Sequence, residues 1–409
     1  MESELQDLNP KPPKQPDPNN DGRPLLKPSA ADSSGDLEKK FAAFVRHDVY
    51  GSMGRGELPT REKVLLGVAF VTLVPVRVVA VTTILLLYYF ICRVCTMGSV
   101  PNRVEEHQED YAHIVGWRRI VIVQSGRALS RLMLFVFGFY WITHTYRIPP
   151  APVENSTTTN EQENNAQSED TRPGVIISNH VSYLDILYHM YASFPSFVAK
   201  RSVAKLPLLG LISKCLGCVL VQRESKSSDF KGVSGFWIYS GRLACVGVSQ
   251  LSSDSAYSSV VTERIREAHQ NPSAPTMMLF PEGTTTNGEF LLPFKTGGFL
   301  AKAPVLPVIL TYPYQRFSPA WESISGVRHA IFILCQFVNY MEVIQLPTYY
   351  PSQQEQDDPK LYANNVRRLM ASEVCFPNAN MASSWSVLWL YCAKEGKDSL
   401  GNPVLGYRN

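Results

Sequence analysis

The sequence lacks a strong excess of charge of either sign, because 39 Lys and Arg residues and 36 Asp and Glu residues leave a net charge of only +3. It also lacks the interleaved basic and aromatic motifs with which RNA-binding modules hold bases. A polyanionic partner would need a larger basic surface than this balance provides. We therefore expect no nucleic acid among the partners of this chain.

Cysteine is present without a disulfide framework, since the eight cysteines are scattered along the chain. The polar, proline-rich N-terminus shows no secretory signal, so we expect reduced thiols that face the cytosol. Cys92/Cys95 and Cys215/Cys218 each form a C-x-x-C pair, a spacing also found in zinc sites. Both pairs lie in apolar surroundings, which favours small core residues over zinc ligands.

Several catalytic and ligand-binding motifs are missing from the sequence. It has no G-x-S-x-G turn, no H-E-x-x-H helix, no P-loop and no EF-hand loop. The sequence therefore predicts neither a metal site nor a resident cofactor.

A long apolar run is present, from Val64 to Cys92, and Arg77 is its only charged residue. As a helix it would be about 43 Å long, against roughly 30 Å for the hydrocarbon core of a bilayer. Pro75 and Arg77 fall near its middle, where an arginine is costly in lipid. Two arrangements are open. The second part alone spans while Arg77 snorkels, or the segment bends at Pro75 and returns to the side it entered.

A second apolar segment, from Leu132 to Ile142, is too short to span a membrane by itself. Basic residues flank both apolar segments on both sides, so the distribution of positive charge does not select an orientation. This symmetry favours a helical hairpin seated in one leaflet. The alternative is a pair of buried helices in a soluble domain, but the length of the first run favours attachment to the lipid bilayer.

Composition divides the chain into regions. Residues 1–36 are too polar to fold and are predicted to be disordered. Residues 37–152 form the predicted membrane-anchoring region, which begins with an amphipathic helix over 37–49. A polar linker, 153–172, leads to a predicted catalytic domain over 173–375.

The predicted catalytic domain alternates short apolar strands with helices. The predicted strands are 175–178, 196–199, 219–222, 277–280, 305–312 and 342–346. The predicted helices lie near 183–193, 202–216, 260–269, 295–302 and 359–374. This alternation predicts an α/β fold with a largely parallel sheet flanked by helices, in which ligands bind at the carboxyl ends of the strands.

The stretch "VIISNHVSYLDIL" carries His180 and Asp185, five positions apart. On a continuous helix the two side chains would diverge by roughly 140°. They can meet only if the chain turns between them, with His180 on a loop and Asp185 in the first helical turn. The carboxylate would then hold one ring nitrogen and leave the other free as a base. The alternative is a capping box, in which Ser182 and Asp185 only satisfy backbone N–H groups.

Four ordered motifs resemble those of the glycerolipid acyltransferase family, which includes glycerol-3-phosphate, lysophosphatidic acid and lysophospholipid acyltransferases. The motifs are Asn179-His180 with Asp185, then Arg223, then residues 280–284, then residues 305–308. Lys200, Pro207, Gly210 and Gly217 also match. The resemblance covers roughly residues 64–375.

The resemblance implies a mechanism and a set of site residues. His180 would accept the proton of an acceptor hydroxyl while Asp185 orients its ring, and acyl-CoA would be the co-substrate. Arg223, suited to a phosphate, and the turn formed by Glu282, Gly283 and Thr284 would bind the acceptor. Backbone N–H groups near the start of the helix could stabilise the oxyanion.

The residues after Glu-Gly-Thr bear on the choice of acceptor. Many lysophosphatidic acid acyltransferases have Arg there, whereas this chain has Thr285, Thr286 and Asn287. The resemblance thus favours lysophospholipids with head groups, lysophosphatidylethanolamine first, in phospholipid synthesis and remodelling. It implies the endoplasmic reticulum membrane, with the catalytic domain in the cytosol. A lysophosphatidic acid acyltransferase and an inactive acyltransferase-like membrane protein are the alternatives.

Two segments depart from the family pattern. Residues 236–259 are weakly charged and interrupt the passage from the Arg223 strand to the next helix, so they are predicted to be an insertion. Residues 376–409 form an atypical C-terminal tail.

Overall fold

The structure is a computed structural model. It describes residues 42–51, 56–105, 108–147, 172–221, 255–320, 324–374, 396–397 and 403–406. Several predictions lie outside these residues: the disordered segment 1–36, nearly all of the linker 153–172, Arg223, most of the insertion 236–259 and most of the tail 376–409.

A seven-stranded sheet forms the centre of the described chain, in the order β3-β10-β9-β4-β7-β5-β6. The strands in that order are β3 (Ile142–Tyr146), β10 (Met341–Gln345), β9 (Val305–Thr311), β4 (Val175–Ser178), β7 (Met277–Leu279), β5 (Ser196–Lys200) and β6 (Val219–Val221). All neighbouring pairs are parallel except β9 with β10. The predicted fold class, an α/β fold with a largely parallel sheet, is confirmed.

Each strand predicted from residue 175 onwards is present within one residue of its predicted ends. One strand of the same sheet was missed. β3 begins at Ile142, where the second apolar segment ends, and it pairs in parallel with β10. The central sheet therefore includes a strand from the region predicted to anchor the protein in the membrane.

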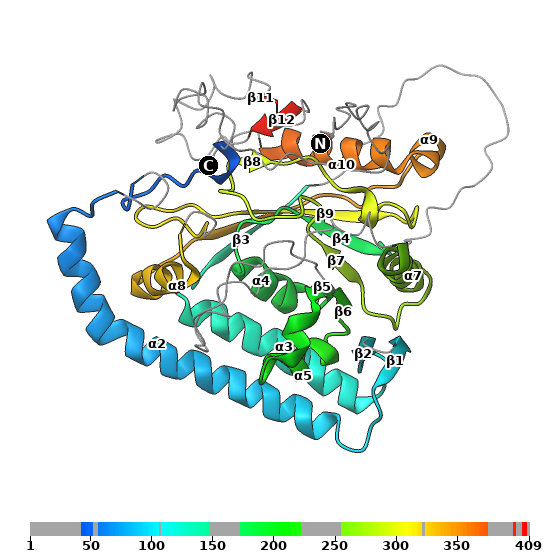
Figure 1. Cartoon of the computed structure of the whole chain (residues 1–409), viewed down its shortest axis with the longest axis horizontal. Coiled ribbons are helices and arrows are strands. Elements are labelled where there is room, and N and C mark those ends of the chain that lie inside the picture. Colours follow the sequence, from blue (N-terminus) through cyan, green and yellow to red (C-terminus); the bar gives the residue numbers. More distant parts are fainter. Residues whose placement is uncertain are drawn as a thin grey trace, which may run out of the picture. The chain divides into compact units, whose positions relative to one another are not determined.

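Helices cover both faces of this sheet (Figure 1). On one face are α2 (Thr60–Cys95), α3 (Trp117–Val136), α4 (Leu184–Ala192), α5 (Leu209–Cys215) and α8 (Gly326–Cys335); on the other are α7 (Ser255–Gln270) and α10 (Pro359–Val374). Ile176 belongs to the apolar core on the first face, whereas Val175 and Ile177 belong to the core on the second. Successive strand residues alternate in this way because their side chains point to opposite faces.

The remaining described elements are short. They are β1 (Asn102–Glu105), β2 (Gln108–Asp110), β8 (Phe290–Leu291), α9 (Gln353–Asp357), β11 (Gly396–Lys397) and β12 (Pro403–Gly406). β1 and β2 form an antiparallel pair, and β12 lies between β11 and β8 in a small antiparallel sheet. The four cysteines of the C-x-x-C pairs are buried as free thiols, as expected of core residues.

Some helix predictions were wrong in extent. The predicted helix over 202–216 is a 3-10 helix, Arg201–Lys205, followed by α5, because Pro207 lies between them and cannot donate a helical hydrogen bond. The helix predicted over 295–302 is only the 3-10 turn Thr296–Gly298, since two glycines disfavour a longer helix. Helix α7 starts at Ser255, so residues 255–259 of the predicted insertion belong to a helix.

The predicted amphipathic helix over 37–49 is also wrong in its described part. Only Ala42–Phe44 is helical, as a single 3-10 turn, and residues 45–49 are not helical. Long-range bonds decide this conformation. Asn287 and Arg316 bond the backbone of this segment at Ala43, Val45 and Val49.

Helix α2 is continuous through Pro75, with 36 residues and a length of about 54 Å. Among the described helices it alone is long and apolar enough to cross a membrane. It neither bends back at Pro75 nor leaves Arg77 to snorkel. Instead, α3 packs beside it, so the two helices form a hairpin (Figure 1).

The side chain of Arg77 is turned into the protein, where the residue is only 4% exposed. Its guanidinium donates to the carbonyl oxygens of Leu334 at 2.9 Å and Gln336 at 2.5 Å, where α8 ends, and to Phe337 at 3.0 Å. The carbonyl of Leu334 lies in the last turn of α8, where carbonyls lack partners within the helix and carry the negative end of its dipole. Arg77 therefore joins α2 to the end of α8 rather than reaching for a lipid head group.

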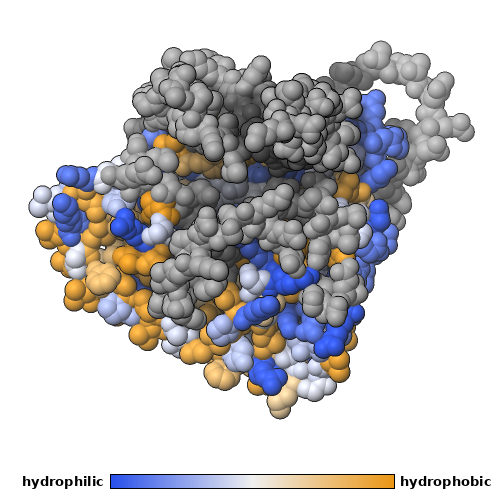
Figure 2. All heavy atoms as spheres, viewed as in Figure 1, coloured by the Kyte–Doolittle hydropathy of each residue, from blue (hydrophilic) through white to orange (hydrophobic). Residues whose placement is uncertain are grey.

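Polar contacts hold α2 against the rest of the chain from its first turn to just beyond its last. They join Arg316 to Glu62, Arg77 to Leu334, Tyr88 to Ile122, and Arg118 to the carbonyl of Met97. The opposite side of α2 is apolar and exposed, with Val68, Val71 and Val79 between 60% and 74% accessible. Figure 2 shows hydrophobic residues gathered over this helix, along the left and lower edge.

Candidate active site

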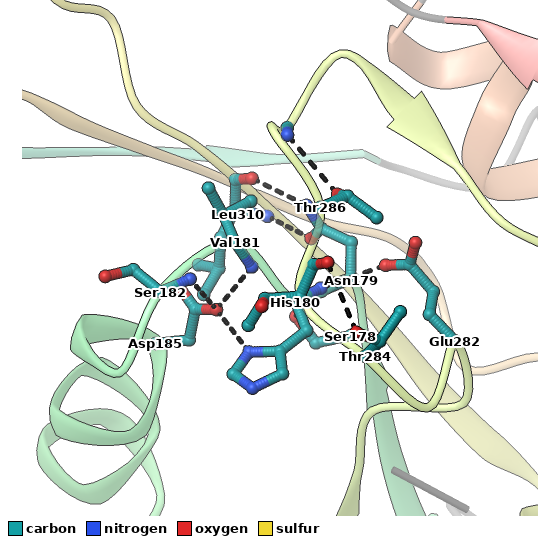
Figure 3. Close-up of polar contacts among 12 residues, drawn as sticks. Ser178, Asn179, His180, Val181, Ser182, Asp185, Glu282, Thr284, Thr286 and Leu310 are labelled. Atoms are coloured by element: carbon teal, nitrogen blue, oxygen red, sulfur yellow. Dashed lines mark hydrogen bonds and ion pairs between the residues drawn. The ribbon is translucent and has the colours of Figure 1, made fainter. Parts of the chain in front are cut away.

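His180 and Asp185 meet at the carboxyl end of β4 (Figure 3). His180 lies on the loop after the strand and Asp185 in the first turn of α4, as predicted. The His180 Nδ1 atom is 2.7 Å from Asp185 Oδ2, and both side chains are almost wholly buried. The turn between strand and helix thus brings the two residues together, which a continuous helix would prevent.

The carboxylate of Asp185 serves both of the roles considered from the sequence. Its Oδ2 atom also accepts from the backbone N–H groups of Val181 at 2.8 Å and Ser182 at 3.0 Å. The hydroxyl of Ser182 has no hydrogen-bond partner among the described residues, so the reciprocal half of a capping box is missing. Asp185 therefore supports the helix start and holds the histidine ring at the same time.

The Nε2 atom of His180 is buried and has no hydrogen-bond partner in the described chain. With Nδ1 donating its proton to the carboxylate, Nε2 carries the free lone pair. The face of the ring stacks on Phe280, with centroids 4.0 Å apart and planes tilted by 14°. The ring is thus fixed in position while one nitrogen stays open for proton transfer.

Strand β9 holds this loop from the neighbouring position in the sheet. The side chain of Asn179 accepts from the backbone N–H of Leu310 at 2.8 Å and donates to its carbonyl at 2.9 Å, so it replaces a backbone pairing. Two residues further, the hydroxyl of Tyr312 donates to Asp185 Oδ1. The sequence analysis missed Tyr312, because no local spacing relates it to a residue 127 positions earlier.

Glu282 lies beside the pair, and both of its carboxylate oxygens accept hydrogen bonds from backbone N–H groups. Its Oε1 accepts from the N–H of His180 and its Oε2 from the N–H of Leu292, each at 3.0 Å. Burial raises the pKa of this carboxyl to about 8, although these two bonds and Arg367 oppose the rise. Glu282 therefore fixes the catalytic loop, and binding of the acceptor by this side chain stays a prediction.

The turn after Glu282 needs glycine. Gly283 has φ +83°, a left-handed conformation that side chains with a Cβ rarely adopt. Its N–H donates to the carbonyl of Phe280 at 3.2 Å, which closes the turn. Thr284 is partly buried next to it, while Arg223 lies outside the described residues. The roles of Gly283, Thr284 and Arg223 in acceptor binding stay predictions.

The N–H groups closest to the pair are already in use. His180 donates to Glu282, and Val181 and Ser182 donate to Asp185. The expectation that N–H groups near the helix start stabilise the oxyanion is therefore wrong for these three, because a donor bound to a carboxylate is not free for a second anion.

A segment preceding α2 is bonded to the turn that follows Glu-Gly-Thr. The backbone N–H of Asn287 donates to the carbonyl of Ala43 at 2.8 Å, and its side-chain amide donates to Val45 at 2.9 Å. The neighbouring N–H of Thr286 donates to the carbonyl of His180 at 2.9 Å. Residues 42–50 are thus connected to the catalytic loop through two consecutive residues.

A second histidine, His189, was also missed. It lies four residues after Asp185 on α4, is 2% exposed, and its ring meets that of Phe280 edge to face at 6.1 Å. Burial lowers its pKa to about 4, so it is neutral at physiological pH. In the part of the chain that the structure describes, no group of three or more His, Cys, Asp or Glu side chains could hold a metal ion.

Comparison with known proteins gives the class first. Residues 157–311 match the family described as Acyltransferase. This range contains both the His180–Asp185 pair and the Glu282–Thr284 turn. The enzyme class predicted from the four motifs, an acyltransferase, is confirmed.

The relatives narrow this class. The chain is 58% identical to the lysophospholipid acyltransferase LPEAT1 of Arabidopsis thaliana, over 91% of each chain. It is 30% identical to lysophosphatidylcholine acyltransferase 1 of Danio rerio, over 78% of this chain and 51% of the relative, so it spans about half the length of that protein. The chain belongs to the lysophospholipid acyltransferase family.

Among solved structures, the lysophosphatidic acid acyltransferase PlsC from Thermotoga maritima aligns with 77% of this chain and 96% of its own. The TM-score of this alignment is 0.39 and the sequence identity 14%.

Proposed function

We propose that this chain transfers an acyl group from acyl-CoA to the free hydroxyl of a lysophospholipid. The observation that carries the mechanism is the state of His180, whose Nδ1 is held by Asp185 while its buried Nε2 has no partner among the described residues. A base held in this way accelerates proton transfer by typically 10²–10⁴-fold.

The reaction balances without a resident cofactor. His180 Nε2 accepts the proton of the acceptor hydroxyl as the oxygen attacks the thioester carbonyl, and a carbon–oxygen bond forms. The carbon–sulfur bond then breaks, and the proton on Nε2 passes to the departing thiolate, which leaves as coenzyme A. Asp185 remains ionised and stabilises the imidazolium in between.

Lysophosphatidylethanolamine is the acceptor that we propose. Positions 285–287 carry no cation, whereas an arginine at this place would suit the doubly charged phosphate of lysophosphatidic acid. In this chain Thr286 and Asn287 are buried and used for bonds to the catalytic loop and to residues 42–50. The identity to a plant lysophospholipid acyltransferase supports a lysophospholipid as the acceptor.

We also propose that α2 lies in one leaflet along the membrane surface. A helix of about 54 Å that packs along its length against α3, α5 and α8 cannot cross a core of roughly 30 Å without burying part of the sheet unit in lipid. The apolar side of α2 then enters the membrane. The membrane would be that of the endoplasmic reticulum, with the sheet on its cytosolic side.

A panel assay tests the activity. Microsomes containing the wild-type chain or His180→Ala would receive labelled acyl-CoA with lysophosphatidylethanolamine, lysophosphatidylcholine or lysophosphatidic acid. We expect the fastest transfer to lysophosphatidylethanolamine and none above background with His180→Ala. Faster transfer to lysophosphatidic acid would overturn the choice of acceptor. Wild-type incorporation equal to that of His180→Ala would show an inactive acyltransferase-like protein.

Thiol labelling tests the arrangement of α2. Cysteines placed at exposed Glu57 or Val100, before and after the helix, would be probed in sealed microsomes with a membrane-impermeant maleimide. The background would carry Ser in place of Cys245, Cys375 and Cys392. We expect both positions to react without detergent. Labelling of only one of them in intact microsomes would establish a spanning helix.

A further inference from the structure

Tyr312 directly follows β9 and is 2% exposed. Its hydroxyl donates to Asp185 Oδ1, the carboxylate oxygen that does not contact His180. Its ring packs edge to face on Phe139, with centroids 6.0 Å apart, which fixes the direction of the hydroxyl. The residue therefore touches the catalytic pair from the side opposite the substrate hydroxyl that His180 would deprotonate.

The contacts of Asp185 are unevenly divided between its two oxygens. Oδ2 receives His180 and two backbone N–H groups, while Oδ1 receives Tyr312. A carboxylate with only one oxygen anchored can rotate about its last torsion, because terminal torsions of this kind are broad. The bond to Oδ1 removes this freedom.

We propose that Tyr312 is a positioning residue of the acyl transfer, which orients the Asp185 carboxylate and sets how strongly it stabilises the His180 imidazolium. This inference rests on the proposed function. A hydroxyl that donates to a carboxylate withdraws part of its negative charge, so less remains to stabilise a neighbouring cation. The bond from Tyr312 therefore limits how strongly Asp185 can stabilise a proton on His180.

The protonation state of Tyr312 is compatible with this role. Burial, followed by the negative charge of Asp185, raises the pKa of the phenol well above its ordinary value. The hydroxyl therefore stays protonated and acts as a donor throughout the working pH range. Without Tyr312 the Oδ1 atom would have no hydrogen-bond donor among the described residues, in a wholly buried site.

Other titratable groups lie near the pair, and the test must separate their effects from the effect of Tyr312. Tyr183 and His189 lie on or beside α4, and Glu282 lies on the loop after β7, close enough to influence Tyr312, Asp185 or each other. His189 is neutral, and the raised pKa of Glu282 makes it largely neutral at pH 7. A change confined to Tyr312 should therefore act on His180 through Asp185.

The test compares Tyr312→Phe with Tyr362→Phe in the full chain in microsomes. Tyr362 is equally buried and donates to the carbonyl of Ala303 at 2.9 Å on the other face of the sheet, so its variant loses one buried bond away from the site. For Tyr312→Phe we expect kcat to fall about tenfold, less than the 10²–10⁴-fold attributable to a general base. We expect the KM for the acceptor to change little.

The pH profile distinguishes positioning from simple loss of structure. In Tyr312→Phe the acidic limb of the kcat/KM profile should move upward by about half a unit to one unit, because the carboxylate recovers charge that stabilises the imidazolium. Tyr362→Phe should lower stability and leave the profile in place. An unmoved profile for Tyr312→Phe, or an equal movement in both variants, would overturn the proposal.

A second readout does not depend on activity. The histidines would be labelled with 15N in detergent-solubilised protein, and the His180 signal assigned with His180→Ala. We expect the titration midpoint of His180 to rise in Tyr312→Phe and to be unchanged in Tyr362→Phe. If the wild-type chain transferred no acyl group, the proposed function would fail while this titration still decided whether Tyr312 acts on His180. No change in the titration would reject the role of Tyr312.

Discussion

Two buried polar clusters can be compared: the His180–Asp185 pair at the carboxyl end of β4, and Arg77 at the junction of α2 with α8. Both are almost wholly buried, and both depend on contacts between residues far apart in the sequence. Both terminal nitrogens of Arg77 donate to oxygens of other elements. In the pair, by contrast, every partner immobilises the side chains, and yet His180 Nε2 has no hydrogen-bond partner among the residues that the structure describes.

The difference distinguishes a polar cluster that stabilises the fold from one whose open nitrogen can take part in a reaction. A buried polar atom without a partner destabilises the protein, so in a native site it calls for an explanation. The acyl transfer proposed here provides that explanation for Nε2, since the acceptor hydroxyl would be its partner. The terminal nitrogens of Arg77 are both bonded, and its role is to hold α2 against the end of α8.

Replacement of the base should have the largest effect. His180→Ala should lower acyl transfer by at least about 10²–10⁴-fold, because proton removal from the acceptor is lost. The protein should still float with vesicles, since the apolar side of α2 is unchanged. Steady-state assays and vesicle flotation measure the two properties. If His180→Ala retained wild-type turnover, the His180–Asp185 cluster would be structural, like that of Arg77.

Asp185→Asn tests whether the carboxylate does more than support α4. We expect activity to fall by about 10²-fold or more, because an amide favours the wrong histidine tautomer and does not stabilise the imidazolium. Activity is measured with saturating acyl-CoA, and folding by the unfolding midpoint in detergent. If stability fell by about 1 kcal/mol while turnover survived, the carboxylate would be a helix cap only.

Arg77→Met should show the opposite pattern. The loss of its charged hydrogen bonds should lower the free energy of unfolding by about 3 kcal/mol, while activity per folded molecule changes little. Arg93→Met is the matched control, because Arg93 is an exposed arginine in the last turn of the same helix and its loss should change stability by less than about 0.5 kcal/mol. Equal losses of stability in the two variants, measured by chemical unfolding, would contradict the role of Arg77 at the junction of α2 with α8.

The last prediction concerns the dependence of stability on pH that Glu282 causes. Its folded-state pKa of about 8 lies above the ordinary 4.5, so the folded protein binds an extra proton between these values. The stability that this proton contributes is fully present below about pH 4.5 and is lost as pH rises through about 8, with a slope of at most about 1.4 kcal/mol per unit.

Unfolding curves of the wild type and Glu282→Gln between pH 5 and 9 provide the measurement. The variant has a neutral side chain at every pH. The stability of the wild type relative to the variant should therefore fall as pH rises from 5 to about 8. A stability difference that did not depend on pH would mean that Glu282 is ionised across this range. Its buried site would then hold a charged group, as the site of Arg77 does.

Local patterns in the sequence were sufficient for much of the fold and for the central pair. Alternating apolar strands and helices predicted the sheet, because strand and helix periods arise from neighbouring residues. His180 and Asp185 were found because only five positions and one turn separate them. The apolar run of α2 was visible for the same reason, because its apolar residues follow one another in the sequence.

Tertiary structure decided the rest, because the decisive contacts join residues that no local period relates. Tyr312 reaches Asp185 only because β9 lies beside β4, and Arg77 is turned inward only because α8 ends beside α2. Glu282 bonds the backbone of both His180 and Leu292 because the loops after β4 and β7 converge. The sequence alone thus identified the His180–Asp185 pair, and packing determined what holds the two side chains in place.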